Sequence, residues 1–197
     1  MLTVKDFSGF QIGGVVTLST VQVIEDFNAM SVDFEIKDVR QYTEPNGSLD
    51  YTGYVLHTHL DAELMYMLMV RRVGNDFDMI LYYLDIEGDV SEAGEIVLDE
   101  EGQNFLPRYE TVLEAANGDP QEVTWDQKGG GTFFGVEYSD AESEDDATKT
   151  LTEYFTADEC GGNPHAFLEW SGDSENGWVE MWMGHEVNSS DVTLFNV

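Results

Sequence analysis

The sequence predicts a mostly β protein in which antiparallel sheets form a sandwich or a partly open barrel. Three observations predict this fold class. Apolar and polar residues alternate over residues 31–42, which is typical of a strand with one buried face. The longest apolar runs lie within residues 53–85 and are rich in strand-favouring Val, Ile and Tyr. The last fifty residues hold short apolar segments that turn signals separate about every ten residues.

The length of 197 residues is enough for one domain with a real core. We therefore expect a single compact unit over residues 1–197. The alternative is a division into an N-terminal β subdomain (1–100) and a similar C-terminal β meander (121–197), because both parts consist of predicted strands.

In the first part, β-branched residues predict a strand or a bent pair of strands over residues 15–24, which residues 25–28 interrupt. The next strand covers residues 31–42, and its alternation places four apolar side chains in the core: Val32, Phe34, Ile36 and Val39. A turn is expected at Pro45–Gly47, before the chain returns as a strand.

Residues 53–85 are the expected centre of the fold. Leu64–Val73 is apolar at almost every position, which fits a strand buried on both faces. A short buried helix is the alternative, since Leu and Met favour helices. The tight turn expected at Gly74–Asn75 favours the strand. The methionines at alternate positions of this run are expected to fill the core.

In the second part, one short helix is predicted near residues 109–116, before a stop signal. Gly129–Gly131 predicts a turn, and the acidic residues 139–146 predict a solvated loop. Four strands should follow, at residues 149–155, 166–170, 178–184 and 191–195.

The formal net charge is −32, from 40 acidic and 8 basic residues. Such a chain repels phosphate backbones and anionic lipids, which argues against binding to nucleic acid or to a membrane surface. It attracts cations, namely metal ions, polyamines or a protein with a basic face. The alternative is that the charge serves solubility in a salty cytoplasm.

The single cysteine, Cys160, excludes an intrachain disulfide. The N-terminus shows no signal peptide, and no apolar run approaches the roughly 18 residues of a membrane span. A cytoplasmic location and no insertion into a membrane are therefore expected.

One arrangement of side chains points to chemistry. His57 and His59 are two residues apart, which would place both imidazoles on one face of a strand, and Glu63 follows. Two imidazoles and a carboxylate suit a divalent metal ion, and the pattern resembles the first metal motif of cupins. The alternative is a pair of strand-edge histidines without a metal, and apart from this metal no cofactor is expected.

Four further stretches share features with one family: Ile12–Thr20, Leu56–Met65, Gly131–Tyr138 and Phe167–Val192. They resemble the YjfK-like family of bacterial proteins of unknown function. On this resemblance, His57 is the family-like histidine and His59 is incidental. The resemblance implies a non-enzymatic partner of a bacterial membrane-stress system, because members tend to be encoded near phage-shock-type proteins and an ATP-grasp ligase similar to glutathionylspermidine synthases.

These observations lead to three hypotheses of function. The leading one is a non-catalytic interaction or scaffold protein of a bacterial membrane-stress system, with a protein partner that has a basic face. The second is a cupin-like metal-binding or metalloenzyme domain that uses His57, His59 and Glu63. The third is a cation- or polyamine-binding module.

Overall fold

The computed structural model describes residues 11–43, 50–73, 76–89, 112–114, 120–122, 125–140, 143–156, 164–171 and 177–195, and every structural statement here concerns those residues. Between residues 112 and 156 it describes the backbone alone. The elements are, in chain order, β1 (Val15–Leu18), α1 (Val21–Phe27), β2 (Val32–Thr43), β3 (Asp50–Thr58), β4 (Asp61–Val73), β5 (Asp76–Asp89), β6 (Val112–Glu114), β7 (Pro120–Glu122), β8 (Trp125–Asp140), β9 (Ser143–Thr156), β10 (Pro164–Ser171), β11 (Trp178–Glu186) and β12 (Val192–Phe195).

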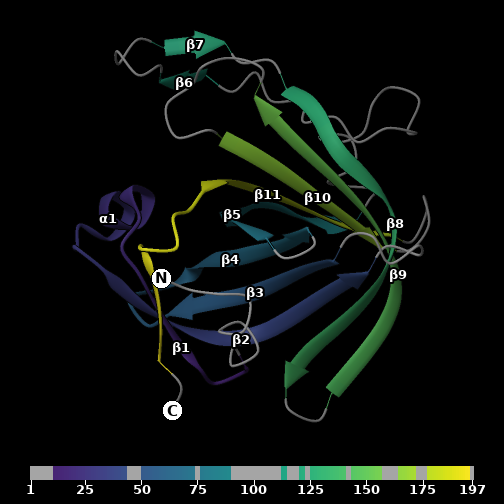
Figure 1. The fold of residues 1–197 in the computed structure, drawn as a ribbon, viewed down its shortest axis with the longest axis horizontal. Helices are drawn as coiled ribbons and strands as arrows, with labels where there is room; N and C mark the ends of the chain where they lie inside the picture. Colours follow the sequence, from purple (N-terminus) through teal and green to yellow (C-terminus); the bar gives the residue numbers. More distant parts are fainter. Residues whose placement is uncertain are drawn as a thin grey trace.

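Ten of the strands form one antiparallel sheet (Figure 1), in the order β12-β1-β2-β3-β4-β5-β11-β10-β9-β8. One edge of β2 is shared by two strands, since β1 pairs with Val32–Glu35 and β8 pairs with Val39–Thr43. The sheet therefore curls back on β2 along a short ladder and has the form of a partly open barrel. The prediction of a mostly β, antiparallel fold is confirmed, whereas the division into residues 1–100 and 121–197 stays a prediction.

A bulge at Lys37 decides which side chains of β2 enter the barrel. Ile36 pairs with Leu56 and Asp38 pairs with Val55, so Lys37 is an extra residue in the ladder. An extra residue shifts the alternation of the strand by one position. As a result, the apolar side chains before the bulge and the polar side chains after it lie on opposite faces of the sheet.

The sheet has an apolar core on each face. The outer cluster, on the face that α1 covers, includes Val32, Phe34, Ile36 and Val39, as predicted. The inner cluster lies inside the curl and consists of Tyr42, Tyr51, Met67, Met69, Ile80, Tyr82, Phe167 and Trp182. β4 contributes alternate residues to both clusters, which confirms that Leu64–Val73 is a strand buried on both faces and that its methionines fill the core.

The strand predicted over residues 15–24 is wrong beyond Leu18, because Val21–Phe27 is the helix α1. The Thr20 side chain caps this helix by accepting a hydrogen bond from the Val23 amide at 3.3 Å. Val23 is fully buried, and the ring of Phe27 packs edge-on against Phe34 at 6.0 Å. Tertiary burial and a good cap thus outweigh the β-branched composition.

The helix predicted near residues 109–116 is wrong at Val112–Glu114, where the chain forms β6 and pairs with β7; residues 109–111, 115 and 116 are outside the described ranges. A hairpin supplies hydrogen bonds to a segment too short for a stable helix. Gly129–Gly131 lies within β8 and pairs with β9, so the predicted turn is also wrong. The predicted acidic loop shrinks, since β8 continues to Asp140 and β9 begins at Ser143.

The four predicted C-terminal strands are confirmed as β9, β10, β11 and β12. The last one does not continue the meander, because β12 crosses to pair with β1 at the other end of the sheet. The hairpin between β4 and β5 pairs Val73 with Asp76, which leaves two residues for the connection, as expected. The turn predicted at Pro45–Gly47 lies outside the described residues.

Candidate functional site

The first candidate site is a pocket of about 450 Å³ beside the bulge of β2, which we call the His57 pocket. Its lining residues come from β1, β2 and the end of β3: Gly13, Val15, Asp33, Phe34, Glu35, Lys37, His57, Thr58 and His59. Glu35 is the cross-strand partner of His57, so their side chains share one face of the sheet. The backbone of Gly13 has a φ of +82° and leaves open space beside its Cα.

Charged and hydrogen-bonding groups fill the walls of this pocket. The Lys37 ammonium lies 2.6 Å from Glu35 Oε1, and both side chains are about half exposed. Thr17 Oγ1 donates a hydrogen bond to Asp33 Oδ1 at 2.5 Å. The pocket therefore holds one satisfied ion pair and one carboxylate that has a hydroxyl donor and no cation among the described side chains.

The environment of the His57 imidazole favours its neutral form. Burial lowers the pKa of His57 and the nearby Lys37 lowers it further, while Glu35 acts in the opposite direction. A neutral imidazole offers a lone pair to a metal ion or to a hydrogen-bond donor.

The structure brings His57 and His59 together at this pocket but does not place them on one strand face. β3 ends at Thr58, and His59 lies in the exposed turn that leads into β4. The backbone of Glu63 belongs to β4, and its side chain is outside the described part of the structure. Within the described residues, no group of three or more His, Cys, Asp or Glu side chains is arranged to hold a metal ion. The set His57, His59 and Glu63 stays a prediction.

A second polar constellation crosses the interior of the barrel, and sequence reasoning missed it. Arg40 is 8% exposed and reaches from β2 across the barrel to β11. Its guanidinium donates to both carboxylate oxygens of Glu180 and, through Nε, to Asp38 Oδ2 at 3.2 Å. Its Nη1 lies 3.6 Å from Glu169 Oε2 on β10, and its Cζ lies 5.7 Å from the ring centre of Trp182.

The partners of Arg40 are themselves held in place. Trp182 donates from Nε1 to Glu180 Oε2 at 3.0 Å, and the Tyr42 hydroxyl donates to Glu169 Oε2. Burial raises the pKa of Tyr42 well above its usual value, and the charge of Glu169 adds to this effect. Burial opposes the charge of Arg40, but Tyr42, Glu169 and Glu180 raise the pKa of Arg40 well above its usual value. The guanidinium thus stays charged and ties three strands together across the core.

One signal in the sequence could have revealed this network. After Ile36, the alternation of β2 breaks at three successive positions, Asp38, Val39 and Arg40, which are all buried. Two charged residues at core positions after an alternating run indicate a bulge and a buried ion pair. Their partners on β10 and β11 cannot be read from sequence, because they lie about 130 to 140 residues away.

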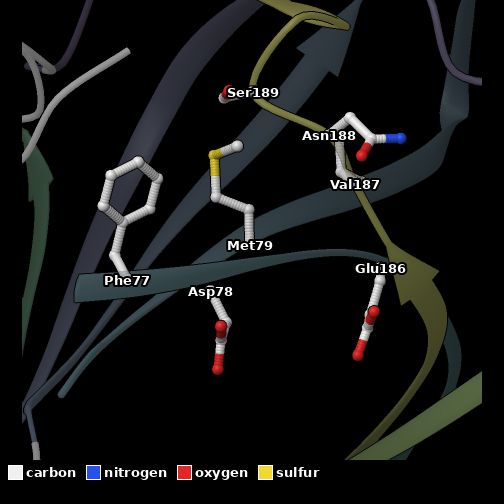
Figure 2. Close-up of a pocket in the computed structure, with 7 residues that line it drawn as sticks. All are labelled: Phe77, Asp78, Met79, Glu186, Val187, Asn188 and Ser189. Carbon is white, nitrogen blue, oxygen red and sulfur yellow. The ribbon is translucent and has the colours of Figure 1, made fainter. Parts of the chain in front are cut away.

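A second pocket, of about 480 Å³, lies where β5 meets the end of β11. Figure 2 shows Phe77 and Met79 on one side of β5, and Asp78 on the other side, where Glu186 points in the same direction. Both carboxylates already have a basic neighbour, since Arg71 Nη2 lies 2.5 Å from Asp78 and His165 Nε2 lies 3.5 Å from Glu186. This pocket is therefore the weaker candidate for a cationic ligand.

Comparison of the chain with protein-family models, with curated proteins and with solved structures finds no match. The candidate sites therefore rest on the geometry of this chain alone. Among the described residues, no helix is both long and apolar enough to cross a membrane.

Proposed function

We propose that the protein is a non-catalytic interaction protein that binds a partner with a basic face. The observation that carries this proposal is that basic side chains of the chain are already paired with its own carboxylates. Lys37, Arg40 and Arg71 each form an ion pair with a carboxylate of the same chain. They neutralise only a small part of the charge of 40 acidic residues. The remaining negative field is available to steer and bind a cationic partner.

The proposed partner is a cytoplasmic protein, and the resemblance to the YjfK-like family would place it in a bacterial membrane-stress system. The test is affinity capture from a lysate of the source organism, followed by reconstitution of each retained protein in purified form. The proposal predicts a stoichiometric complex whose affinity falls as salt rises, because salt screens charges at the rim of an interface. Reconstituted complexes that do not respond to salt would contradict it.

A divalent metal ion at the His57 pocket is the second candidate function. It is favoured by one observation, namely that His57 and His59 line the same pocket. Two imidazoles are suitable ligands for zinc or a similar ion, and Glu63 is the third ligand that the sequence predicts. Elemental analysis of the purified protein tests this candidate. Stoichiometric metal that is lost when His57→Ala and His59→Ala are combined would support it, and a metal-free protein that takes up no added zinc would remove it.

A further inference from the structure

We propose that the outer face of the sheet carries a site for a trivalent metal ion, Fe(III), where α1 covers the strands β4, β5 and β11. Its four ligands are a carboxylate, two phenol groups and an imidazole: Asp26, Tyr66, Tyr83 and His185. Two of the four ligands are phenols, so the site differs from clusters of His, Cys, Asp and Glu, of which the described residues hold none. This inference goes beyond the proposed function and does not depend on it.

The strand pairing places the three ligands of the sheet next to one another. Tyr66 on β4 lies directly opposite Tyr83 on β5, and residues paired in this way have Cβ atoms about 4.5–5.5 Å apart on the same face. Tyr83 in turn pairs with Met183 on β11. His185 lies two residues further along β11, which makes it the diagonal neighbour of Tyr83 at about 7–8 Å. The three side chains therefore stand close together on the face that α1 covers.

The fourth ligand comes from α1. The Tyr66 hydroxyl donates a hydrogen bond to Asp26 Oδ2 at 2.5 Å. The same carboxylate also acts electrostatically on Tyr83 and His185, so it lies near all three side chains of the sheet. Tyr66 is only 1% exposed, whereas Asp26 is exposed and leaves a path for an ion to enter from solvent.

His185 provides an independent reason for a ligand at this place. Its Nε2 atom is buried and has no hydrogen-bond partner among the described residues. Burying a polar nitrogen without a partner is costly, and imidazole nitrogens are common metal ligands. A metal ion bound beside Asp26 would satisfy this atom.

Aromatic packing orients the buried phenol of the site. The ring centre of Tyr66 lies 6.2 Å from that of Phe27 and 5.4 Å from that of Phe34. Phe27 follows Asp26 on α1, so the same helix turn supplies one ligand and supports another. Groups that hold a ligand in position contribute to metal affinity.

The charges of the four ligands select a trivalent ion. Two phenolates and one carboxylate carry three negative charges when they bind a metal ion, and imidazole adds none. Such oxygen anions are hard ligands that suit Fe(III), and imidazole suits iron as well. The ion replaces the proton between Tyr66 and Asp26 with little movement, because two ligands of an octahedral ion at about 2.0 Å lie about 2.8 Å apart. Binding releases one proton from each tyrosine.

The experiment is a titration of the whole chain with ferric nitrilotriacetate at pH 7, followed by visible absorption. A phenolate bound to Fe(III) gives a charge-transfer band in the visible region, and we expect this band to saturate at one iron ion per chain. Tyr83→Phe keeps the ring and removes one phenolate, so the band should fall to about half and the affinity at least about tenfold, since even the loss of a group that only orients a ligand lowers metal affinity about 10–100-fold. His185→Gln should weaken binding by a similar factor and keep the band, because both phenolates remain.

Two controls separate this site from the rest of the chain. Tyr82→Phe is the matched control, because Tyr82 precedes Tyr83 in the sequence but belongs to the inner cluster on the other face of the sheet. It should leave the band and the affinity unchanged. The combination of His57→Ala and His59→Ala should also leave both unchanged, because these residues line the His57 pocket.

The absence of a band, a band that does not saturate, or an equal loss in Tyr83→Phe and Tyr82→Phe would overturn the inference. A band that disappears in the variant without His57 and His59 would assign the iron to the His57 pocket and would overturn it as well. If Tyr83→Phe does not fold, His185→Gln decides in its place, and an unchanged affinity in that variant contradicts the site. Salt-dependent binding of a captured partner is independent of all these outcomes.

Discussion

Replacing Arg40 by methionine should destabilise the fold more than any other change of a single charge among the described residues. Methionine is shorter but flexible and has no charge, so the variant keeps most of the volume and loses the ion pairs. Asp38 and Glu180 would then be buried without the guanidinium that now donates to both. Removing one partner of a buried ion pair typically costs about 3–5 kcal/mol.

The burial of Arg40 and its partners favours a loss of stability in the upper part of that range. Its side chain is 9% exposed, and the side chains of Asp38, Glu169 and Glu180 are 11%, 5% and 11% exposed. Water therefore cannot replace the lost donors without opening the barrel. Against a total stability of about 5–15 kcal/mol, the loss is large enough to lower the urea midpoint strongly or to unfold the protein.

The assay is urea unfolding at pH 7, followed by circular dichroism, for Arg40→Met, Glu180→Gln and the double variant. Arg40→Met leaves the buried carboxylate of Glu180 without its cationic partner, and Glu180→Gln removes that negative charge. The double variant should therefore be more stable than the sum of the two single effects predicts, by about 0.5–3 kcal/mol. Lys37→Met is the control, because Lys37 and its partner Glu35 are both about half exposed and surface pairs contribute about 0–1 kcal/mol. A cost below about 1 kcal/mol for Arg40→Met, with additive effects in the double variant, would refute the reasoning.

The remaining predictions concern packing, capping and titration. Gly184→Ala should lower the free energy of unfolding in urea by about 1–3 kcal/mol or more, because a Cβ there would lie 2.2 Å from the carbonyl oxygen of Leu81. Gly14→Ala, whose Cβ would lie 3.0 Å from its nearest backbone atom, should lower it less. Equal losses for the two variants would contradict the packing argument. Thr20→Ala should cost about 1 kcal/mol through loss of the N-cap of α1, and Thr20→Ser should restore most of it. Burial lowers the pKa of His185, so an NMR titration should find this pKa below 6.5. The stability that neutral His185 contributes should be fully present above pH 6.5 and should be lost as the pH falls through the pKa of the folded state. His185→Gln should remove this part of the pH dependence of the free energy of unfolding.

The strands were predictable from sequence because local patterns decide them. The alternation of residues 31–42 and the double-sided apolar run of Leu64–Val73 each correspond to a strand with the expected buried residues. The errors occur where contacts distant in sequence decide the outcome. Val21–Phe27 is a helix because Val23 and Phe27 pack on the outer face of the sheet, and Gly129–Gly131 is a strand because β9 pairs with it.

The candidate site was predictable in part. The spacing of His57 and His59 predicted that they belong to one site, and the structure places both at one pocket. The contribution of β2 to that pocket depends on the bulge at Lys37, and the pairing of Glu35 with His57 depends on the register of β2 and β3. Register is a property of two strands together, so no pattern within one of them reveals it.

The central claim is that the chain binds a cationic partner through its negative charge, and the most direct measurement is calorimetric titration of the captured, purified partner at 50 mM and 300 mM NaCl. The account predicts saturable binding at low salt and an affinity at least about tenfold lower at high salt, since exposed charges are screened within several ångströms at that ionic strength. An affinity that is the same at both salt concentrations, or the absence of any stoichiometric partner at low salt, would contradict it.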